Sequence, residues 1–213
     1  MISNHIYQIP NFFSDDVLEE IRQDAQLKFE HGMFDIKSSL YAGHEAKMQP
    51  SHLVTIFQKI NDVFGYHFRF KTPPRMRLAT ESDVSQHITP VHTDSCLNSP
   101  MQMSCIIYLN KTENNDFLNF YKGDLLGHYS YENIDESTLV KENWSICNAI
   151  LYEENTAVVF PSPLFHGPSF DAGFGDSAKN GRLIIPFFYE IGYDPQFHVK
   201  NNFKPVLKKY ACK

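Results

Sequence analysis

Two amphipathic segments stand in the first third of the chain. Between Leu18 and Phe29, apolar residues recur at intervals of three or four, and Ser14 precedes them as a helix N-cap followed by acids. A second apolar stripe occupies residues 51–64 and is followed by Gly65, a residue typical of helix ends. We therefore expect one helix running to residue 30 and a second between Pro50 and Gly65.

From residue 66 onward the pattern changes to short apolar or alternating runs between turn residues. These runs are 66–70, 76–79, 101–109, 117–121, 146–152, 156–160 and 182–191, and a further edge strand is expected at 6–12. Strands this close together, without intervening helices, predict a sandwich or barrel. Asn114–Asp116 is typical of a hairpin turn, and the polar stretch 122–145 is expected to leave the β core.

The length favours one domain. A chain of 213 residues is long enough for one substantial core and short for two. We expect a single domain over 1–213 that is mainly β with flanking helices. Residues 1–65 form a mostly helical support, and residues 66–200 form an antiparallel β core.

Composition narrows the class of protein. Hydrophobic residues make up 42% and charged residues 21%, which is typical of globular chains. The formal net charge of -6 argues against nucleic-acid binding by charge alone. The four cysteines (Cys96, Cys105, Cys147 and Cys212) are scattered, and we find neither a signal-peptide pattern nor an apolar run long enough to cross a bilayer. We expect a cytoplasmic protein with free thiols and no membrane partner.

The residues with the clearest chemistry are His92 and Asp94, followed far along the chain by His166. Residues i and i+2 of a strand point to the same side, so His92 and Asp94 are expected to project together. The run 157–160 is a strand that leads toward His166. Two imidazoles and one carboxylate leave coordination positions open, as non-haem Fe(II) oxygenases require. Taken alone, the His-x-Asp pattern arises often by chance, and a strand-end or loop histidine is an equally good interpretation.

Arg182 favours the metal site over these alternative interpretations of the two histidines. It opens the strongly apolar run 182–191, so its guanidinium lies either in solvent or against a partner inside the core. Arginine grips carboxylates through two parallel hydrogen bonds, and the distal carboxylate of 2-oxoglutarate is the partner that fits.

The order of these motifs resembles the Fe(II)- and 2-oxoglutarate-dependent oxygenases, in particular their prolyl-hydroxylase-like branch. The segment 104–110, which ends Tyr-Leu-Asn, is similar to the strand after His-x-Asp in that branch. The resemblance implies a double-stranded β-helix, a cupin-like jelly-roll barrel with N-terminal helices packed on one sheet. It implies that His92, Asp94 and His166 bind iron as the catalytic triad, and that Tyr108 joins Arg182 at the distal carboxylate. The alternative for Tyr108 is an ordinary sheet aromatic.

The resemblance also implies the reaction. Fe(II), 2-oxoglutarate and O2 hydroxylate an unactivated C–H bond and release succinate and CO2. Asp94 argues against halogenation, because related halogenases carry a small residue there to admit chloride. Phe188 stands where DNA-dealkylating relatives carry a second arginine.

Two departures from the family pattern matter. The interval between His166 and Arg182 is long and rich in glycine, which indicates an inserted hairpin loop. The stretch 81–90 lacks the usual glycine and tyrosine, so no contact to the C1 carboxylate is assigned; Arg77 and Thr80 are candidates that are equally well explained as core-edge and turn residues.

The substrate is left open among amino acids, small metabolites and peptide or protein side chains, because the loops 31–50, 81–90, 122–145 and 167–181 carry no recognisable signature. Two other classes of function also stay open. One is a cupin-like metal protein that does not use 2-oxoglutarate, and the other is a non-catalytic binding domain.

Overall fold

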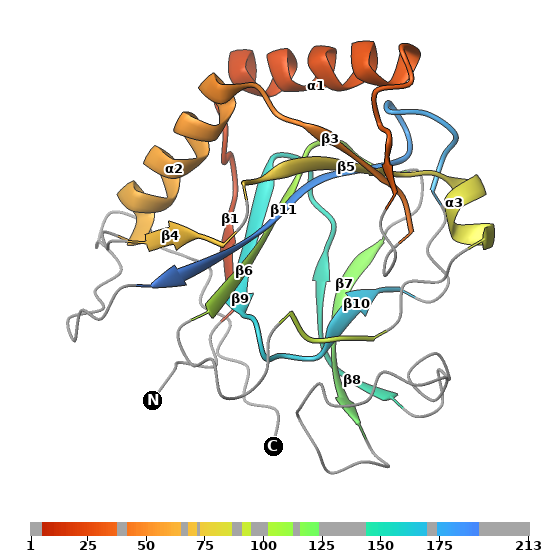
Figure 1. Ribbon diagram of the computed structural model, residues 1–213. Coiled ribbons are helices and arrows are strands. Elements are labelled where there is room, and N and C mark those ends of the chain that lie inside the picture. Colours follow the sequence, from red (N-terminus) through yellow and green to blue (C-terminus); the bar gives the residue numbers. More distant parts are fainter. Residues whose placement is uncertain are drawn as a thin grey trace.

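A computed structural model shows two antiparallel sheets with helices packed against the larger one (Figure 1). The structure describes residues 6–37, 42–64, 68–71, 73–86, 91–94, 102–112, 116–123, 144–169 and 174–191. Within these residues, none of the helices is both long and apolar enough to cross a membrane.

The large sheet has eight strands. In spatial order they are β1 (Tyr7–Ile9), β9 (Thr156–Pro161), β6 (Gln102–Tyr108), β11 (Arg182–Ile191), β5 (Arg75–Ala79), β3 (His44–Lys47) and β2 (Ile36–Lys37), while β4 (Phe68–Phe70) pairs with the end of β11. The small sheet consists of β10 (His166–Pro168), β7 (Phe117–Gly123) and β8 (Trp144–Leu151), in that order.

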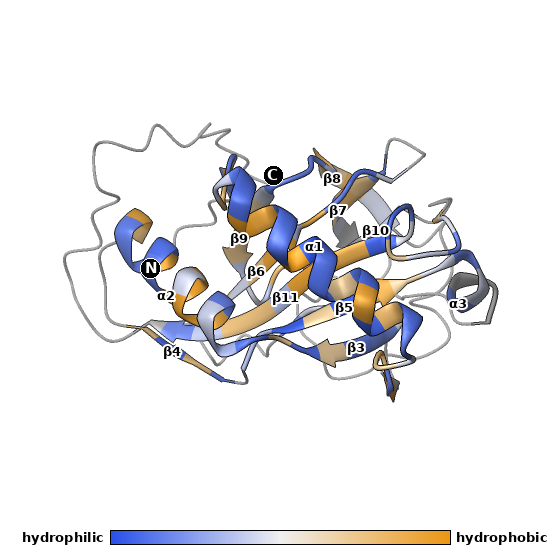
Figure 2. Cartoon of the chain, turned by 90° about the horizontal axis from the view of Figure 1, so that it is seen from above, coloured by the Kyte–Doolittle hydropathy of each residue, from blue (hydrophilic) through white to orange (hydrophobic). Residues whose placement is uncertain are grey.

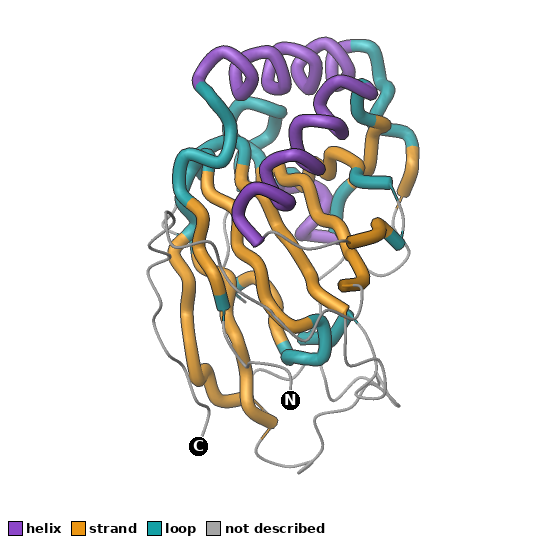
Figure 3. Tube along the Cα trace, turned by 90° about the vertical axis from the view of Figure 1, so that its left-hand side faces the viewer, coloured by secondary structure: helices purple, strands orange, loops and turns teal. Residues whose placement is uncertain are grey.

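The two long helices, α1 (Asp15–Glu30) and α2 (Pro50–Phe64), lie on one side of the large sheet (Figure 3). The apolar residues that predicted α1 include Leu18, Ile21 and Ala25, which are all buried. Ser14 has the extended backbone of an N-cap, but its side chain makes no capping hydrogen bond. The short helix α3 (Glu81–Gln86) lies in a segment that we expected to be a loop.

The central strands of the large sheet are buried on both faces, which explains their nearly continuous apolar sequences. On β11, the odd-numbered residues 183–189 belong to the core between the sheet and the helices. The even-numbered residues Arg182, Ile184, Pro186 and Phe188 line a pocket on the opposite face. Figure 2 shows how much of β6, β9 and β11 is hydrophobic. One strand thus supplies the core with one face and the pocket with the other.

Most of the predicted elements are confirmed, with shifted ends. The sequence missed β2, β3, β10 and α3, which are short or polar. Most of the predicted turn at Asn114–Asp116 and of the excursion 122–145, together with Gly65, lies outside the described residues. Neither sheet closes on itself within the described part of the chain, so the closed barrel stays a prediction.

The cysteines differ from the expectation. Cys105 on β6 is a buried free thiol, and burial raises its pKa well above the usual value. Cys147 on β8 is disulfide-bonded. The expectation of free thiols is therefore wrong for Cys147. Spacing along the chain gave no signal for this bond.

Candidate metal and 2-oxo acid site

The backbone brings the two histidines together. His92 and His166 form an isolated antiparallel bridge, in which the His92 N–H donates to the His166 carbonyl at 3.0 Å and the His166 N–H donates to the His92 carbonyl at 2.8 Å. His166 opens β10, which also pairs with β7 opposite Phe120. The chain reaches β10 from β9 through a turn in which the Leu164 N–H donates to the Pro161 carbonyl at 3.1 Å. His166 therefore lies in the small sheet and does not continue β9.

Asp94 completes the group. Its N–H donates to the Ser162 carbonyl at 2.9 Å, which ties the segment 91–94 to the same turn. His92 Nε2 lies 3.6 Å from Asp94 Oδ1, and His166 Nε2 lies 3.3 Å from Asp94 Oδ2. His92 and Asp94 point to the same side, as strand alternation predicts. The segment 91–94 nevertheless forms only a single β-bridge, at His92.

The Asp94 carboxyl is ionised in this setting. Its side chain is 5% exposed. Burial by itself raises the pKa of the carboxyl, but the adjacent His166 and His92 outweigh burial and hold the pKa well below its ordinary value. A buried carboxylate between two imidazoles suits a cation.

The triad fits one metal ion. The ligand atoms of His92, Asp94 and His166 all lie within 4.8 Å of one another. Two ligands at about 2.1 Å from an ion, on adjacent octahedral positions, lie about 3.0 Å apart. The two histidine–aspartate distances, 3.3 and 3.6 Å, are slightly longer than this value.

The orientation of His166 leaves the correct nitrogen for a metal. His166 Nδ1 lies 2.9 Å from the Leu164 carbonyl, which can only accept a hydrogen bond. Nδ1 therefore carries a proton, and Nε2, which lies 3.3 Å from Asp94 Oδ2, is the ring nitrogen that would bind a metal. The Phe160 ring packs edge-on against the imidazole, with centroids 4.6 Å apart, and fixes the ring plane. A backbone carbonyl that orients a histidine is a common feature of metal sites.

Arg182 occupies the start of β11 inside the protein, so its interpretation as an exposed strand-edge residue is wrong. It is only 8% exposed, and its Nε has no hydrogen-bond partner. Burial lowers the pKa of the guanidinium, but Tyr152, Tyr108 and Asp116 raise it by more, so the group remains charged. Arg182 and the His92–Asp94–His166 triad line the same pocket.

Two tyrosines surround this guanidinium. Tyr108 is fully buried at the end of β6, opposite Ile184 of β11. Tyr152 follows β8, and its ring centroid lies 3.8 Å from that of Tyr108. Burial raises the pKa of both phenols, so both carry a proton to donate. Neither hydroxyl has a hydrogen-bond partner.

A carboxylate shares this neighbourhood. Burial raises the pKa of Asp116, and Arg182 lowers it by a smaller amount. Asp116 Oδ1 accepts a hydrogen bond from the Phe117 N–H at 2.8 Å, whereas the buried Oδ2 has no partner. Asp116 therefore offsets part of the Arg182 charge.

Of the two candidates for binding the C1 carboxylate, Arg77 lines the pocket and Thr80 is not among its lining residues. Arg77 lines the pocket and donates two hydrogen bonds to Glu45 Oε1, from Nε at 3.1 Å and from Nη2 at 2.6 Å. The Thr80 N–H and hydroxyl both bond to Asp83 Oδ2 at the start of α3. The Asp83 side chain therefore caps the start of α3, and Thr80 lies in the turn before this helix, as its interpretation as a turn residue implies.

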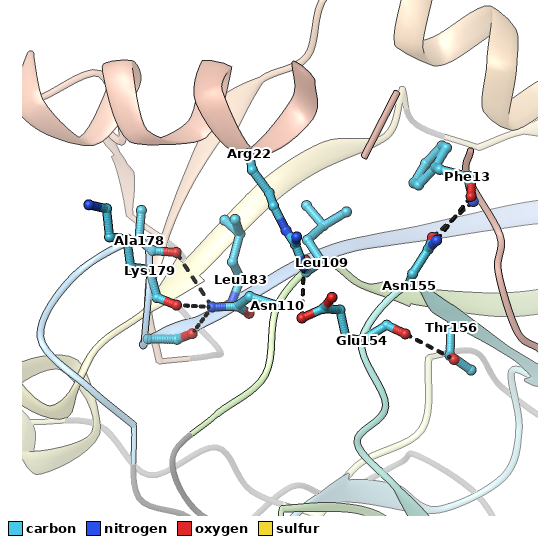
Figure 4. A network of polar contacts seen from close by, with 11 residues as sticks. Phe13, Arg22, Leu109, Asn110, Glu154, Asn155, Thr156, Ala178, Lys179 and Leu183 are labelled. Atoms are coloured by element: carbon cyan, nitrogen blue, oxygen red, sulfur yellow. Dashed lines mark hydrogen bonds and ion pairs between the residues drawn. The ribbon is translucent and has the colours of Figure 1, made fainter. Parts of the chain in front are cut away.

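The long interval before Arg182 folds back on the β core and is held by Asn110. Asn110 Nδ2 donates to the carbonyls of Ala178, Lys179 and Gly181 at 3.4, 3.1 and 2.8 Å (Figure 4). Its Oδ1 accepts from the Leu183 N–H at 3.2 Å. This loop carries Phe174, whose ring centroid lies 5.9 Å from Arg182 Cζ.

The sequence did not indicate Tyr152, Asp116 or Asn110 as residues of the site. Asn110 belonged to the Tyr-Leu-Asn motif, and its four hydrogen bonds now explain that asparagine. Tyr152 and Asp116 face each other across the small sheet, where the Tyr152 N–H donates to the Asp116 carbonyl at 2.8 Å. No local pattern marks either residue, because their proximity to Arg182 arises from the packing of two sheets.

Comparison with solved structures identifies the fold, whereas comparisons of sequence find no match. No protein-family model matches the sequence, and no curated protein is significantly similar to it. HygX from Streptomyces hygroscopicus, in a structure with nickel, 2-oxoglutarate and hygromycin B bound, is similar with a TM-score of 0.56 at 13% identity, covering 88% of this chain and 83% of HygX.

Two further structures are similar at the same level. A prolyl hydroxylase from Trichoplax adhaerens, in complex with a hypoxia inducible factor peptide fragment, has a TM-score of 0.55 at 12% identity, covering 88% of this chain and 84% of its own. SnoK, a non-haem alpha-ketoglutarate-dependent carbocyclase from nogalamycin biosynthesis, has a TM-score of 0.55 at 13% identity, covering 94% and 87% of the two chains. At such identities the likeness shows that the chain has the fold of the 2-oxoglutarate-dependent oxygenases.

Proposed function

We propose that this chain is an Fe(II)- and 2-oxoglutarate-dependent oxygenase that hydroxylates a C–H bond of a small molecule or of a peptide or protein side chain. In this proposal His92, Asp94 and His166 bind the iron, and Arg182 and Tyr108 bind the distal carboxylate of 2-oxoglutarate. The chain acts as a single domain over 1–213, in which the two sheets form the double-stranded β-helix of these enzymes.

The observation that carries the proposal is that one pocket contains both the triad and a buried arginine with a free donor. His92, Asp94 and His166 stand together at one part of the lining, and Arg182 stands at another. A 2-oxo dicarboxylate has a chelating end for a metal and a carboxylate for a guanidinium, so it satisfies both at once. A metal protein that does not use such a ligand gains nothing from the buried, partly unsatisfied Arg182.

The protein residues bind and orient, and the bound iron with 2-oxoglutarate and O2 supplies the oxidising chemistry. Arg182 fixes the far end of the co-substrate through paired hydrogen bonds. Ile106, Leu118 and Ile184 line the pocket with apolar side chains that limit the entry of water. Asp94 stays ionised because the two histidines hold its pKa low, and it neutralises part of the metal charge.

The substrate class follows from the comparisons only in broad terms. HygX was solved with hygromycin B, and the prolyl hydroxylase was solved with a peptide. Both a small molecule and a peptide side chain therefore fit this fold. Succinate release, measured against a panel of amino acids, metabolites and peptides, identifies the substrate.

Anaerobic titration tests the function directly. The protein with Fe(II) and 2-oxoglutarate should develop a weak visible absorption band that neither ligand produces alone. The band should be absent from Asp94→Ala, because two ligands do not hold the metal, and it should need far more 2-oxoglutarate in Arg182→Ala.

The other classes predict different results. A cupin-like metal protein binds iron but gives no band with 2-oxoglutarate and is indifferent to Arg182→Ala. A non-catalytic domain binds neither ligand. A folded wild-type protein that gives no band contradicts the proposal.

A further inference from the structure

Tyr152 belongs to a buried cluster between the two sheets, and it is the residue beside Arg182 to which the family pattern assigns no role. It lies just after β8, and the Tyr152 N–H donates to the Asp116 carbonyl at 2.8 Å. Its ring centroid is 5.7 Å from Arg182 Cζ and 3.8 Å from the centroid of Tyr108. The small sheet thereby places a phenol against an arginine of the large sheet.

Around Arg182, the buried hydrogen-bond donors outnumber the acceptors that could pair with them. By hydrogen-bond geometry the Tyr152 hydroxyl, the Tyr108 hydroxyl and Arg182 Nε are all buried without a partner, although the Tyr152 hydroxyl lies close enough to the Arg182 guanidinium to stabilise its charge. A buried polar group without a partner costs free energy, so three such groups together indicate that a ligand satisfies them. Because all three are donors, the ligand must offer acceptors.

A carboxylate matches this set. Its two oxygens accept about four hydrogen bonds, of which a guanidinium fork uses two and leaves two for hydroxyl donors. Asp116 already offsets part of the Arg182 charge. Binding of a second anion here therefore depends on directed donors more than on net charge.

We propose that Tyr152 donates a hydrogen bond to the distal carboxylate of the 2-oxo acid co-substrate, beside Arg182 and Tyr108, and so selects a 2-oxo dicarboxylate over a 2-oxo monocarboxylate. This inference rests on the proposed function and adds a second tyrosine to the distal carboxylate site. The geometry that carries it is one pair of buried phenol rings, in contact and tilted by 44°, beside one buried guanidinium.

The test is calorimetric binding of two 2-oxo acids to the Ni(II)-loaded protein, which does not turn over. 2-Oxoglutarate carries the distal carboxylate, and 2-oxopentanoate has the same chain length without it. In Tyr152→Phe we expect Kd for 2-oxoglutarate to rise about tenfold or more, the effect of losing one hydrogen bond to a charged group. Kd for 2-oxopentanoate should change less than about twofold, since that acid makes no such bond.

Tyr189→Phe is the matched control. Tyr189 is a buried tyrosine of β11 that belongs to the core on the helix side of the sheet, away from the pocket. Its substitution should leave both dissociation constants unchanged. Thermal unfolding checks the fold of each variant, and Tyr152→Leu is a second hydroxyl-free variant if Tyr152→Phe does not fold.

The outcomes are distinct. If Tyr152→Phe weakens the binding of both acids equally, Tyr152 has a purely structural role and the inference is overturned. A Tyr152→Phe variant that binds 2-oxoglutarate like the wild type also overturns it. The proposed function survives both results. A wild-type protein that binds Ni(II) but not 2-oxoglutarate overturns the inference and the proposed function together.

Discussion

At the scale of single residues, the proposed function depends most on the guanidinium of Arg182. It is charged, buried and incompletely hydrogen-bonded, with aromatic rings centred 5.7 and 5.9 Å from its Cζ. Such packing fixes the fork in place before a ligand arrives, so little side-chain entropy is lost on binding. The affinity for the distal carboxylate of 2-oxoglutarate should therefore depend on the shape of the Arg182 side chain as well as on its charge.

Arg182→Lys tests that dependence. Lysine keeps the charge but loses the paired hydrogen bonds, so we expect the affinity for 2-oxoglutarate to fall by about 10- to 100-fold, or about 1.5–3 kcal/mol. Iron affinity should change little, because the triad is untouched. Calorimetry of the metal-loaded protein measures the first quantity and metal analysis measures the second.

Arg69→Lys provides the control for that substitution. Arg69 lies on β4 with an 81% exposed side chain and an ion pair to Glu190 at 2.8 Å, and its replacement should alter neither affinity. If Arg182→Lys binds 2-oxoglutarate as tightly as the wild type, the guanidinium does not bind the distal carboxylate.

Single residues also show what the sequence was able to predict. His92 and Asp94 could be placed together because strand alternation is a local rule. Arg182 could be placed inside because a charged residue opens an apolar strand. Tyr152 could not be predicted, because its neighbours Tyr108 and Arg182 come from the other sheet.

At the scale of elements, the loop before β11 and the first residues of that strand are tied to the end of β6. Asn110, just after β6, ties three carbonyls of this loop to the β core (Figure 4). A neighbouring contact fixes the same end of β6 from the helix side, where Arg22 Nε of α1 donates to the Leu109 carbonyl at 2.7 Å. Gly181 is tightly enclosed, since a Cβ there would lie 2.6 Å from the Ser177 carbonyl oxygen of the same loop and 3.0 Å from the Ala79 carbonyl oxygen of β5.

Asn110→Asp tests the role of this loop. The carboxylate cannot donate, so it loses the three bonds from Nδ2 and faces carbonyl oxygens; we expect the free energy of unfolding to fall by about 2–3 kcal/mol. Denaturant unfolding measures this change. Hydrogen exchange in 174–181 should also accelerate in the variant.

The matched control is Asn61→Asp, which makes the same chemical change at an exposed position of α2 and should alter the free energy of unfolding by less than about 0.5 kcal/mol. Equal effects of the two substitutions would show that the Asn110 contacts do not stabilise the loop.

Elements were predictable where periodicity was strong and were missed where it was weak. The stripes that became α1 and α2 and the apolar runs of the large sheet were visible in the sequence. The strands β2, β3 and β10 have only two to four residues each, which is too short for an alternating pattern. They are held by their neighbours, as His44–Lys47 is by β5.

At the scale of the whole molecule, the residues proposed to bind iron and 2-oxoglutarate come from both sheets. Arg182 and Tyr108 belong to the large sheet, His166 belongs to the small sheet, and His92 and Asp94 come from the segment between β5 and β6. A bound metal with 2-oxoglutarate therefore joins parts of the chain that are far apart in sequence. The mainly β architecture with flanking helices could be predicted from the sequence, but the way that the two sheets face each other could not.

Metal removal should consequently lower global stability. With a divalent metal present at about 100 times its Kd, the folded state gains about 2.7 kcal/mol, and a further increment is expected on adding 2-oxoglutarate. Thermal unfolding with Ni(II), with Ni(II) plus 2-oxoglutarate, and after chelation measures both steps. If 2-oxoglutarate raises the melting temperature equally with and without metal, its binding does not involve the metal.

The most direct test of the account is the iron content of the wild type against Asp94→Ala, both loaded anaerobically and desalted, with His31→Ala at an exposed helix end as the control. We predict about one Fe(II) per chain in the wild type and the control, and loss of most of the iron from Asp94→Ala, because two imidazoles alone hold the ion weakly. Iron retained in full by the Asp94→Ala protein would show that His92, Asp94 and His166 do not form the metal site.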